Sequence, residues 1–315
     1  MNKLFFIIGV GRSGTTLLQC MLNAHPEIGL PVETHFVRKY VVDEARGRMQ
    51  RKISWDDIMN QFRVDTDLAR LNIDIQGVLE PFINGKKSFT YKDMFLELLR
   101  IYSQRVEKEI IGEKDPANTP FLYEIYTAYP DAIIIHIIRD PRDVVLSRSK
   151  TYWGKNRSFW SHVLEYKRLL HKARKLGRLL FNEHYIEILY ENLIANPRKE
   201  LGVICEKLGI SFHDDMLRYY EKAEEIVTEQ EMEWKKNIFK PLLQNNTQNW
   251  RSGLEKWQII VIEGACEEPF AELGYELSGF SKKFSRRFFL SLVYALEIIW
   301  RSKRLARRIL VKSGT

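Results

Sequence analysis

The sequence has few cysteines, and its apolar stretch near the C-terminus is too short to cross a membrane. Three cysteines in 315 residues, Cys20, Cys205 and Cys266, are too few and too scattered for a disulfide framework, and we expect reduced thiols. No histidine or cysteine spacing indicates zinc and no paired acidic cluster indicates magnesium, so we predict a protein without a metal ion. The apolar stretch 288–300 has 13 residues, fewer than the roughly 20 of a spanning helix.

The body of the chain also lacks the basic excess of a nucleic-acid-binding protein. The net charge is +8, but residues 281–315 alone hold ten lysines and arginines against one acid, Glu297. The preceding 280 residues carry 39 basic and 40 acidic side chains, so we predict no nucleic-acid partner.

Residues 1–8 imitate the charged and apolar regions of a signal peptide. Their apolar run is short, no small-residue cleavage site follows, and the run continues into a glycine loop that needs it as a strand. We therefore expect this segment to be structural and the protein to be cytoplasmic.

Short apolar runs alternate with helix start signals along the chain. We predict strands at residues 4–9, 110–112, 132–138 and 185–189, and helices at 15–22, 117–129 and 197–208. A further helix is expected to begin after Asp140, a natural N-cap, with Pro141 at its first position. This alternation predicts an α/β fold with a mainly parallel central sheet.

Two segments stand apart from this alternation. Residues 42–105 have helical periodicity and no motif, and we interpret them as a helical insertion in one domain that spans 1–280. We expect residues 281–315 to form a basic amphipathic helical tail. The tail suits an anchor at the surface of an anionic membrane, but it also suits a helical hairpin packed on the body or on another subunit.

The first predicted strand runs into the loop Gly9-Val10-Gly11-Arg12-Ser13-Gly14-Thr15-Thr16. Glycines followed by a helix N-terminus are typical of phosphate-binding loops, because free amides and the helix dipole attract anions. In the nucleotide triphosphatase pattern a lysine that reaches the terminal phosphates stands where this chain has Thr15. The loop therefore favours a ligand with a shorter anionic group.

With the motifs NAHPEI and IIIHIIRDPRDVVLSR, the loop GVGRSGTTLL resembles the sulfotransferases that use 3′-phosphoadenylyl sulfate (PAPS). The branch of the tyrosylprotein sulfotransferases and many bacterial enzymes is the most similar. Weaker similarity extends over residues 5–276 and leaves the tail uncovered. The resemblance implies a P-loop-type three-layer fold.

The resemblance also implies roles for single residues. Those for the 5′-phosphosulfate are Arg12, Ser13, Gly14, Thr15 and Thr16, and those for the 3′-phosphate are Arg139 and Ser147. Tyr190 matches a tyrosine that touches the nucleotide. Arg139 would follow a buried strand, at the sheet edge where ligands bind, whereas we expect Arg142 to be a solvated surface charge.

For catalysis the resemblance implies Glu33 as the base and Lys114 and Arg12 as cations that stabilise the transition state. His35 is the alternative base, because other sulfotransferases use histidine and its pKa suits proton transfer. The chain departs from the pattern at Asn249, where related enzymes have a cation that Arg251 could replace. This departure leaves the last contact with the nucleotide open.

The sequence thus predicts an enzyme that moves a sulfuryl group from PAPS to a hydroxyl of an unidentified glycan, glycolipid or other small amphiphile. A small-molecule kinase of the P-loop class is the alternative, and it would need a lysine elsewhere and a magnesium carboxylate such as Asp140. A nucleotide-binding membrane adaptor without catalysis is a third reading.

Overall fold

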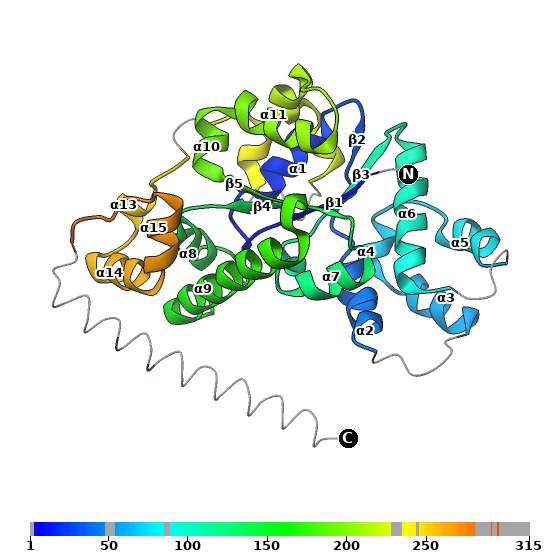
Figure 1. Cartoon of the computed structure of the whole chain (residues 1–315), viewed down its shortest axis with the longest axis horizontal. Coiled ribbons are helices and arrows are strands. Elements are labelled where there is room, and N and C mark those ends of the chain that lie inside the picture. The colour runs from blue at the N-terminus through cyan, green and yellow to red at the C-terminus, as the bar shows by residue number, and fades with distance from the viewer. Residues whose placement is uncertain are drawn as a thin grey trace. The chain divides into compact units, whose positions relative to one another are not determined.

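A computed structural model describes residues 3–47, 54–84, 89–227, 235–243 and 246–280, together with positions 291 and 295. The chain divides into two compact units (Figure 1). The first is built from residues 1–139 and 172–246. The second is built from residues 140–171 and the described part of 247–315. The predicted tail lies almost wholly outside the described residues, so its helical form stays a prediction.

The first unit contains a five-stranded sheet in which the paired strands are parallel. Its spatial order is β2-β3-β1-β4-β5. The strands are β1 (Leu4–Ile8), β2 (Ile28–Gly29), β3 (Ile110–Lys114), β4 (Ile133–Ile138) and β5 (Tyr185–Leu189). The four predicted strands are confirmed, with β3 longer than expected, and β2 is an addition that the sequence analysis missed.

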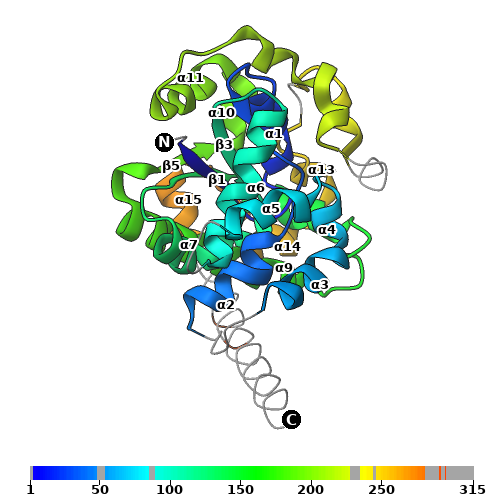
Figure 2. The same cartoon turned by 90° about the vertical axis from the view of Figure 1, so that its right-hand side faces the viewer.

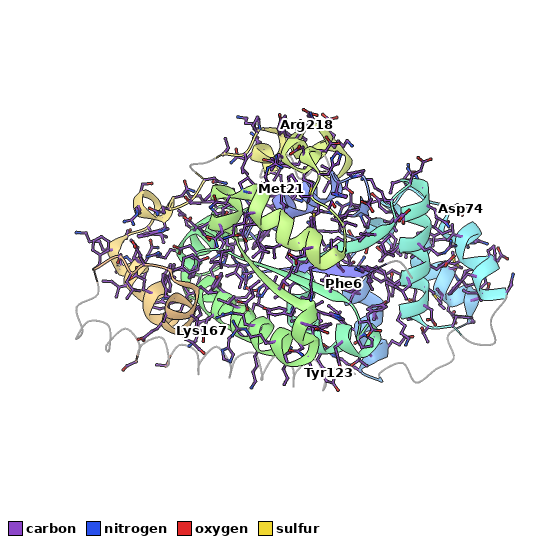
Figure 3. All side chains as sticks on the ribbon, turned by 45° about the horizontal axis from the view of Figure 1, so that its top comes forward. Phe6, Met21, Asp74, Tyr123, Lys167 and Arg218 are labelled. Carbon is purple, nitrogen blue, oxygen red and sulfur yellow. The ribbon has the colours of Figure 1, made fainter. Side chains whose placement is uncertain are left out.

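Side chains on successive strand positions point to opposite faces of the sheet, and each face is buried. Phe6 and Ile8 join one apolar cluster, while Phe5 and Ile7 join the other. Figure 3 labels Phe6 and also Met21, which belongs to the second cluster. Because both faces are covered, the strands read as continuous apolar runs rather than as alternating ones.

Different helices cover the two faces (Figures 1 and 2). The face with Phe6 packs against α6 (Tyr91–Arg105), α7 (Leu122–Ala128) and the π-helical turn η1 (Val37–Val41). The face with Phe5 packs against α1 (Thr15–Asn23), α10 (Tyr190–Ala195), α11 (Pro197–Leu208) and the 3₁₀ segment η5 (Asp214–Glu225). The three-layer fold with a parallel sheet is therefore confirmed.

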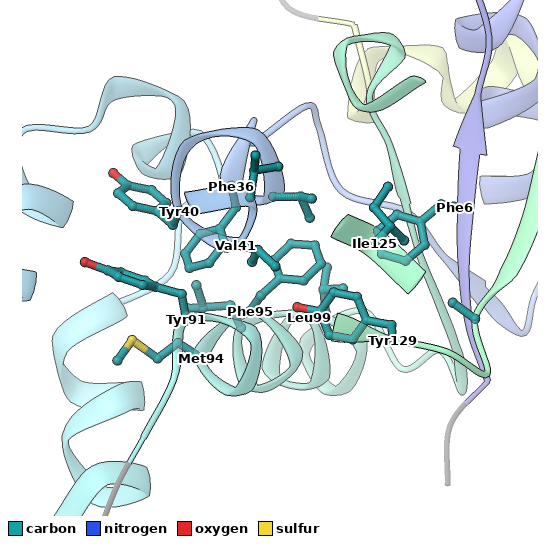
Figure 4. Close-up of a cluster of buried hydrophobic side chains, with 14 of the residues drawn as sticks. Phe6, Phe36, Tyr40, Val41, Tyr91, Met94, Phe95, Leu99, Ile125 and Tyr129 are labelled. Carbon is teal, nitrogen blue, oxygen red and sulfur yellow. The ribbon is translucent and has the colours of Figure 1, made fainter. Parts of the chain in front are cut away.

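Aromatic rings dominate the cluster between the sheet and α6 (Figure 4). The ring of Phe36 stacks on Phe95 with centroids 5.2 Å apart, and Tyr40 stacks on Tyr91 at 5.2 Å. Phe6 brings β1 into the same cluster through Tyr129, at 5.8 Å. Buried aromatic pairs contribute packing beyond their apolar area, so this cluster fixes η1 and the preceding loop against the sheet.

The remaining elements of the first unit are short. The segment predicted as a helical insertion contains α6 and α2 (Val42–Ala45), α3 (Trp55–Arg63), α4 (Thr66–Ala69) and α5 (Ile75–Asn84). Near the sheet lie η2 (Pro116–Phe121), η3 (Gly177–Phe181), η4 (Asn182–His184) and η7 (Lys236–Phe239). The prediction of one helix over 117–129 was wrong, because Pro120 cannot donate an α-helical hydrogen bond and the first turns are 3₁₀.

The second unit contains α8 (Pro141–Ser149), α13 (Trp250–Gly253), α14 (Lys256–Ala265), α15 (Glu267–Leu273) and the start of α9 (Phe159–Leu176), which ends in the first unit. Asp140 caps α8 as predicted, by accepting a hydrogen bond from the amide of Arg142. In the part of the chain that the structure covers, no helix is both long and apolar enough to span a bilayer.

Arg142 is not the solvated surface charge that the sequence analysis expected. It is 3% exposed, and its guanidinium pairs with Asp140 at 2.6 Å and with Glu263 at 2.7 Å. The same group lies 3.7 Å from the ring centroid of Trp250. Two carboxylates and an aromatic face replace the water that a buried cation loses, so Arg142 holds the second unit together.

A buried histidine lies on β4 in the middle of the first unit. Nδ1 of His136 lies 2.6 Å from the hydroxyl of Tyr185, while Nε2 has no hydrogen-bond partner among the described residues. The Tyr185 hydroxyl donates to Glu187, which pairs with Arg174 at 2.9 Å. Burial, the largest cause, lowers the pKa of His136 to about 4, so the ring is neutral in the folded protein.

This shift predicts a loss of stability in acid. Because the folded pKa of about 4 lies below the ordinary value of about 6.5, the unfolded chain binds a proton first as the pH falls between these values. The histidine would thereby lower the free energy of unfolding by up to about 3 kcal/mol across this window. Urea unfolding at pH 7 and pH 5 measures the loss.

The matched control is His136→Phe, which should lose less stability between these two pH values than the unchanged protein. Comparison with this variant is needed because burial raises the pKa of Glu113 to about 8, which acts in the opposite direction. Equal losses in both proteins would contradict the assignment to His136.

Candidate active site

The turn between β1 and α1 has the backbone form of an anion-binding loop. Gly14 is the N-cap residue of α1 and has a left-handed conformation with φ of 97°. A Cβ at this position would lie 2.4 Å from the ring of Tyr190, so only glycine fits. The hydroxyl-bearing residues Thr15 and Thr16 follow as the first two residues of α1. The predicted strand-loop-helix is thus present, with its first amides beside Tyr190.

A threonine that the sequence analysis missed fixes the start of this loop. The side-chain oxygen of Thr119, on η2, accepts a hydrogen bond from the amide of Gly9 at 3.0 Å and donates to the Gly9 carbonyl at 2.9 Å. Thr119 is fully buried. Because the sheet ladder ends at Ile8, this pair of bonds satisfies backbone groups that would otherwise be buried alone.

Two arginines bring positive charge to the loop. The pKa of Arg12 is lowered. Burial is the largest cause, and the charge of Arg139 is the next. Nη1 of Arg139 donates to the carbonyl of Arg12 at 3.5 Å, and Arg139 follows the last residue of β4. Like charges this close in a buried place disfavour one another. An anion bound between them would reverse that effect.

Tyr190 and Asn246 hold Arg139 in place. The guanidinium lies 4.3 Å from the ring centroid of Tyr190, and Nη2 donates to the carbonyl of Asn246 at 2.8 Å. The side-chain amide of Asn246 donates to the Tyr190 hydroxyl at 2.8 Å. Arg139 is therefore oriented from two sides, and Tyr190 contacts both the loop and the arginine.

The hydroxyl of Ser13 is available for a ligand. Ser13 is 1% exposed, and its Oγ makes no hydrogen bond to any described residue. A buried polar atom left without a partner costs free energy, which a bound acceptor such as a phosphate oxygen would recover. Ser13 directly precedes Gly14, so an anion at the glycine loop would lie close to this hydroxyl.

A pocket of the first unit is lined by both polar and apolar residues. Its polar or charged residues and its glycine are Arg12, Gly14, Thr15, Thr16, Arg139, Lys235, Asn237 and Asn246. Its apolar and aromatic residues are Leu17, Tyr190, Ile194, Tyr219, Ile238, Leu242 and Leu243. The pocket residues from Tyr219 to Asn246 were not predicted from the sequence, because they belong to no motif; Tyr219 lies on η5, and Asn237 and Ile238 lie on η7.

Glu33 and Lys114 form a salt bridge at the same sheet edge. Lys114, the last residue of β3, is 1% exposed, and its ammonium donates to Oε1 of Glu33 and to the hydroxyl of Thr16 at 3.4 Å. Oε2 of Glu33 makes no hydrogen bond to a described residue, and the Glu33 side chain is 19% exposed. The structure thus brings the predicted base, the predicted cation and the start of α1 together.

His35, the alternative base, pairs with a different carboxylate. Its Nδ1 lies 2.7 Å from Oδ2 of Asp115, and the residue has φ of 55°, an uncommon backbone conformation outside glycine. Burial alone would lower the pKa of His35, but the hydrogen bond and charge of Asp115 outweigh it and raise the pKa. A raised pKa makes His35 a weaker candidate for a base near neutral pH, because more of it is protonated.

Glu33, His35 and Asp115 could also form a metal site. Their ligand atoms lie within 4.8 Å of one another. This cluster was not predicted from the sequence, because the three residues come from two separate segments. The ammonium of Lys114 already neutralises Glu33 and opposes a second cation at the same carboxylate.

Glu113 links the loop that carries Glu33 to the segment that holds Gly9. It is fully buried, and its two oxygens accept hydrogen bonds from the hydroxyl of Thr34 at 3.1 Å and from the side-chain amide of Asn118 at 2.8 Å. Thr34 is the neighbour of Glu33, and Asn118 precedes Thr119. An acid directly after a predicted strand was the one feature of this network visible in the sequence.

Three predicted positions belong to the second unit. Ser147 lies on α8, and its predicted role towards the 3′-phosphate stays a prediction. Asn249 precedes α13. Arg251 lies 4.6 Å from the ring centroid of Trp250 and donates to the side chain of Gln248.

The family model of the sulfotransferase family matches residues 5–214. A protein-tyrosine sulfotransferase of Drosophila melanogaster is 24% identical over 229 residues, which cover 69% of this chain and 40% of that protein. Protein-tyrosine sulfotransferase 2 of Gallus gallus is 23% identical over 69% of this chain and 54% of that protein. The chain thus spans about half the length of these relatives.

Solved structures of bacterial sulfotransferase domains share the fold. The domain from the Synechococcus PCC 7002 olefin synthase gives a TM-score of 0.59 at 20% identity, covering 88% of this chain and 96% of that one. The domain from the curacin biosynthetic pathway gives 0.63 at 14% identity, covering 88% and 99%. The resemblance stated from the loop motifs is confirmed: with two thirds of its length matched by the family model, the chain belongs to the sulfotransferase family.

Proposed function

We propose that this protein transfers a sulfuryl group from PAPS to a hydroxyl of an acceptor. The observation that carries the proposal is the pairing of Arg12 and Arg139 in the pocket of a glycine loop whose lysine position is Thr15. A triphosphate calls for a loop lysine and a magnesium ion. Two arginines beside a loop without its lysine suit smaller anionic groups, as in a nucleotide that carries a phosphosulfate and a single phosphate instead of a triphosphate.

Different residues would bind different parts of the proposed donor. Arg12, Gly14, Thr15 and Thr16 of the pocket would hold the 5′-phosphosulfate, together with Ser13, whose buried hydroxyl has no hydrogen-bond partner among the described residues. Arg139 would hold the 3′-phosphate, with Ser147 as the partner that the family resemblance implies. The apolar and aromatic residues of the pocket, among them Tyr190 and Tyr219, suit the uncharged part of a nucleotide.

In the proposed reaction the acceptor oxygen bonds to sulfur as the bond from sulfur to the bridging phosphate oxygen breaks. Glu33 would accept the hydroxyl proton at Oε2, because Lys114 holds Oε1. Lys114, through its contact with Thr16, and Arg12 would stabilise negative charge that develops on the sulfuryl and leaving oxygens. The leaving nucleotide is adenosine 3′,5′-bisphosphate.

The acceptor is proposed to be a glycan, glycolipid or other small amphiphile, on account of the basic residues 281–315 and the apolar run within them. We propose that this segment lies on an anionic membrane in the cytoplasm. Cys20, Cys205 and Cys266 are all free and buried, which agrees with a reducing compartment.

Nucleotide preference tests the donor. We expect calorimetry to show tighter binding of adenosine 3′,5′-bisphosphate than of ATP, because the site supplies two arginines and no loop lysine. Arg139→Gln should weaken the binding of the bisphosphate by about 10- to 100-fold, since a hydrogen bond to a charged group contributes roughly 1.5–3 kcal/mol. Arg198→Gln, at an exposed position, is the matched control. Preference for ATP would favour the kinase reading.

Variants of Glu33 and His35 test the base. We expect Glu33→Gln to lower turnover by about 10²- to 10⁴-fold, the range for loss of general-base catalysis, and His35→Gln to have a much smaller effect. Transfer of labelled sulfate from PAPS to a lipid and glycan extract measures both. The opposite result, with a rate that falls as the pH drops through the raised pKa of His35, would make histidine the base.

Chelation tests the metal prediction. We expect turnover to be unchanged by EDTA, because Lys114 already supplies the positive charge at Glu33. Activity that disappears on chelation and returns with magnesium would contradict this, and Asp115→Asn would then show whether the Glu33, His35 and Asp115 cluster holds the ion.

A further inference from the structure

The loop between α8 and α9 places aromatic and basic side chains on the surface of the second unit. Tyr152 is 61% exposed and Trp153 is 37% exposed. Residues 150–158 also include Lys150, Lys155 and Arg157, and no acid. The Arg148 guanidinium lies 5.1 Å from the ring centroid of Trp153, so this ring is partly covered. A nine-residue loop with two exposed aromatic side chains and three positive charges is still unlike an ordinary solvated turn, since large aromatic side chains are usually buried.

Hydrogen bonds within the loop keep these side chains outside. The hydroxyl of Thr151 donates to the carbonyl of Arg148 at 2.8 Å, and the amide of Gly154 donates to the carbonyl of Thr151 at 3.0 Å. The ring of His162 lies 3.1 Å from the Gly154 carbonyl. A Cβ on Gly154 would lie 1.9 Å from the Arg148 carbonyl. The backbone is therefore tightly held, and the aromatic rings are presented on a fixed frame.

Two of the three positive charges are uncompensated. Arg157 pairs with Glu165 at 2.6 Å, and the same carboxylate accepts from Arg148 at 2.9 Å. Lys150 and Lys155 are exposed, and neither forms an ion pair with a residue that the structure describes. The exposed side of the loop therefore carries net positive charge.

A second aromatic group begins where the loop ends. Phe159 and Trp160 open α9, and their rings lie 5.1 Å and 6.4 Å from that of Trp257 on α14. Trp257 is 40% exposed, and its indole NH donates to Glu255 at 2.5 Å. This group extends the amphipathic character of the loop to the start of α14.

We propose that this surface, formed by residues 150–160 and Trp257, binds the interface of an anionic membrane. Tyrosine and tryptophan favour the headgroup level of a bilayer, where the ring is apolar and the polar atom stays hydrated. Lysines add attraction to anionic lipids. A soluble polyanion would use the lysines but not the exposed apolar surface of the two rings. The proposal depends neither on sulfuryl transfer nor on residues 281–315.

A fluorescent label on the full chain tests the contact. The three native cysteines are buried, so an environment-sensitive dye can be attached at Tyr152→Cys. Val64→Cys, 79% exposed in the first unit, is the matched control. We expect a blue shift at position 152 with vesicles of phosphatidylcholine and phosphatidylserine, none with phosphatidylcholine alone, and none at position 64.

Charge removal tests the lysines. Lys150→Gln with Lys155→Gln should lower partitioning to the anionic vesicles by about 10- to 30-fold, because each lysine near such a surface contributes roughly 1 kcal/mol. Lys175→Gln with Lys222→Gln, two exposed lysines of the first unit, changes the net charge equally and should have little effect.

Three results would overturn the proposal. The first is vesicle binding without a shift at position 152, which would assign binding to residues 281–315. The second is an equal loss in both lysine pairs, which would reduce the effect to net charge. The third is a label that responds to heparin and not to vesicles, which would assign the loop to a soluble polyanion.

Discussion

Parallel pairing of β1 with both β3 and β4 is the constraint on which the site depends. The register aligns Ile7 with Lys114 and Ile8 with His136, so the three strands end at nearly the same level. Carboxyl ends of parallel strands meet at one sheet edge. The glycine loop, Lys114 and Arg139 therefore converge although they are far apart in sequence. A slip of one residue would turn every side chain of that strand to the opposite face.

Much of this arrangement could be predicted from sequence. The apolar strands, the Asp140 cap and the glycine loop each follow from local chemistry, because short buried runs, N-caps and tight turns require particular residue types. Local rules also failed where a long-range partner decides the outcome. Arg142 was predicted to be a surface charge. It is buried instead, because its guanidinium donates a hydrogen bond to Glu263, 121 residues later in the sequence. The pocket residues between Tyr219 and Asn246 belong to no sequence motif.

The same limit applies to the residues behind the site. Thr119 and Glu113 touch no predicted ligand group, yet they satisfy the backbone of Gly9 and the side chain of Thr34. Each is one partner of a buried hydrogen bond whose other partner is distant in sequence. Such pairs cannot be identified in a single sequence, since neither residue type is unusual alone. Loss of either hydrogen bond would lower the free energy of unfolding substantially, because buried polar groups have no water to replace a lost partner.

The adjacency of β2 and β3 has a consequence for how such a protein can evolve. Ile28 pairs with Ile110, so the chain leaves the sheet after β2 and returns at the neighbouring strand, about 5 Å away. Glu33, His35 and helices α2 to α6 all lie between these two strands, whereas Arg12 and Arg139 of the pocket lie outside this segment. Recombination at two points that are close in space could therefore exchange the segment and leave the glycine loop and both arginines unchanged in sequence.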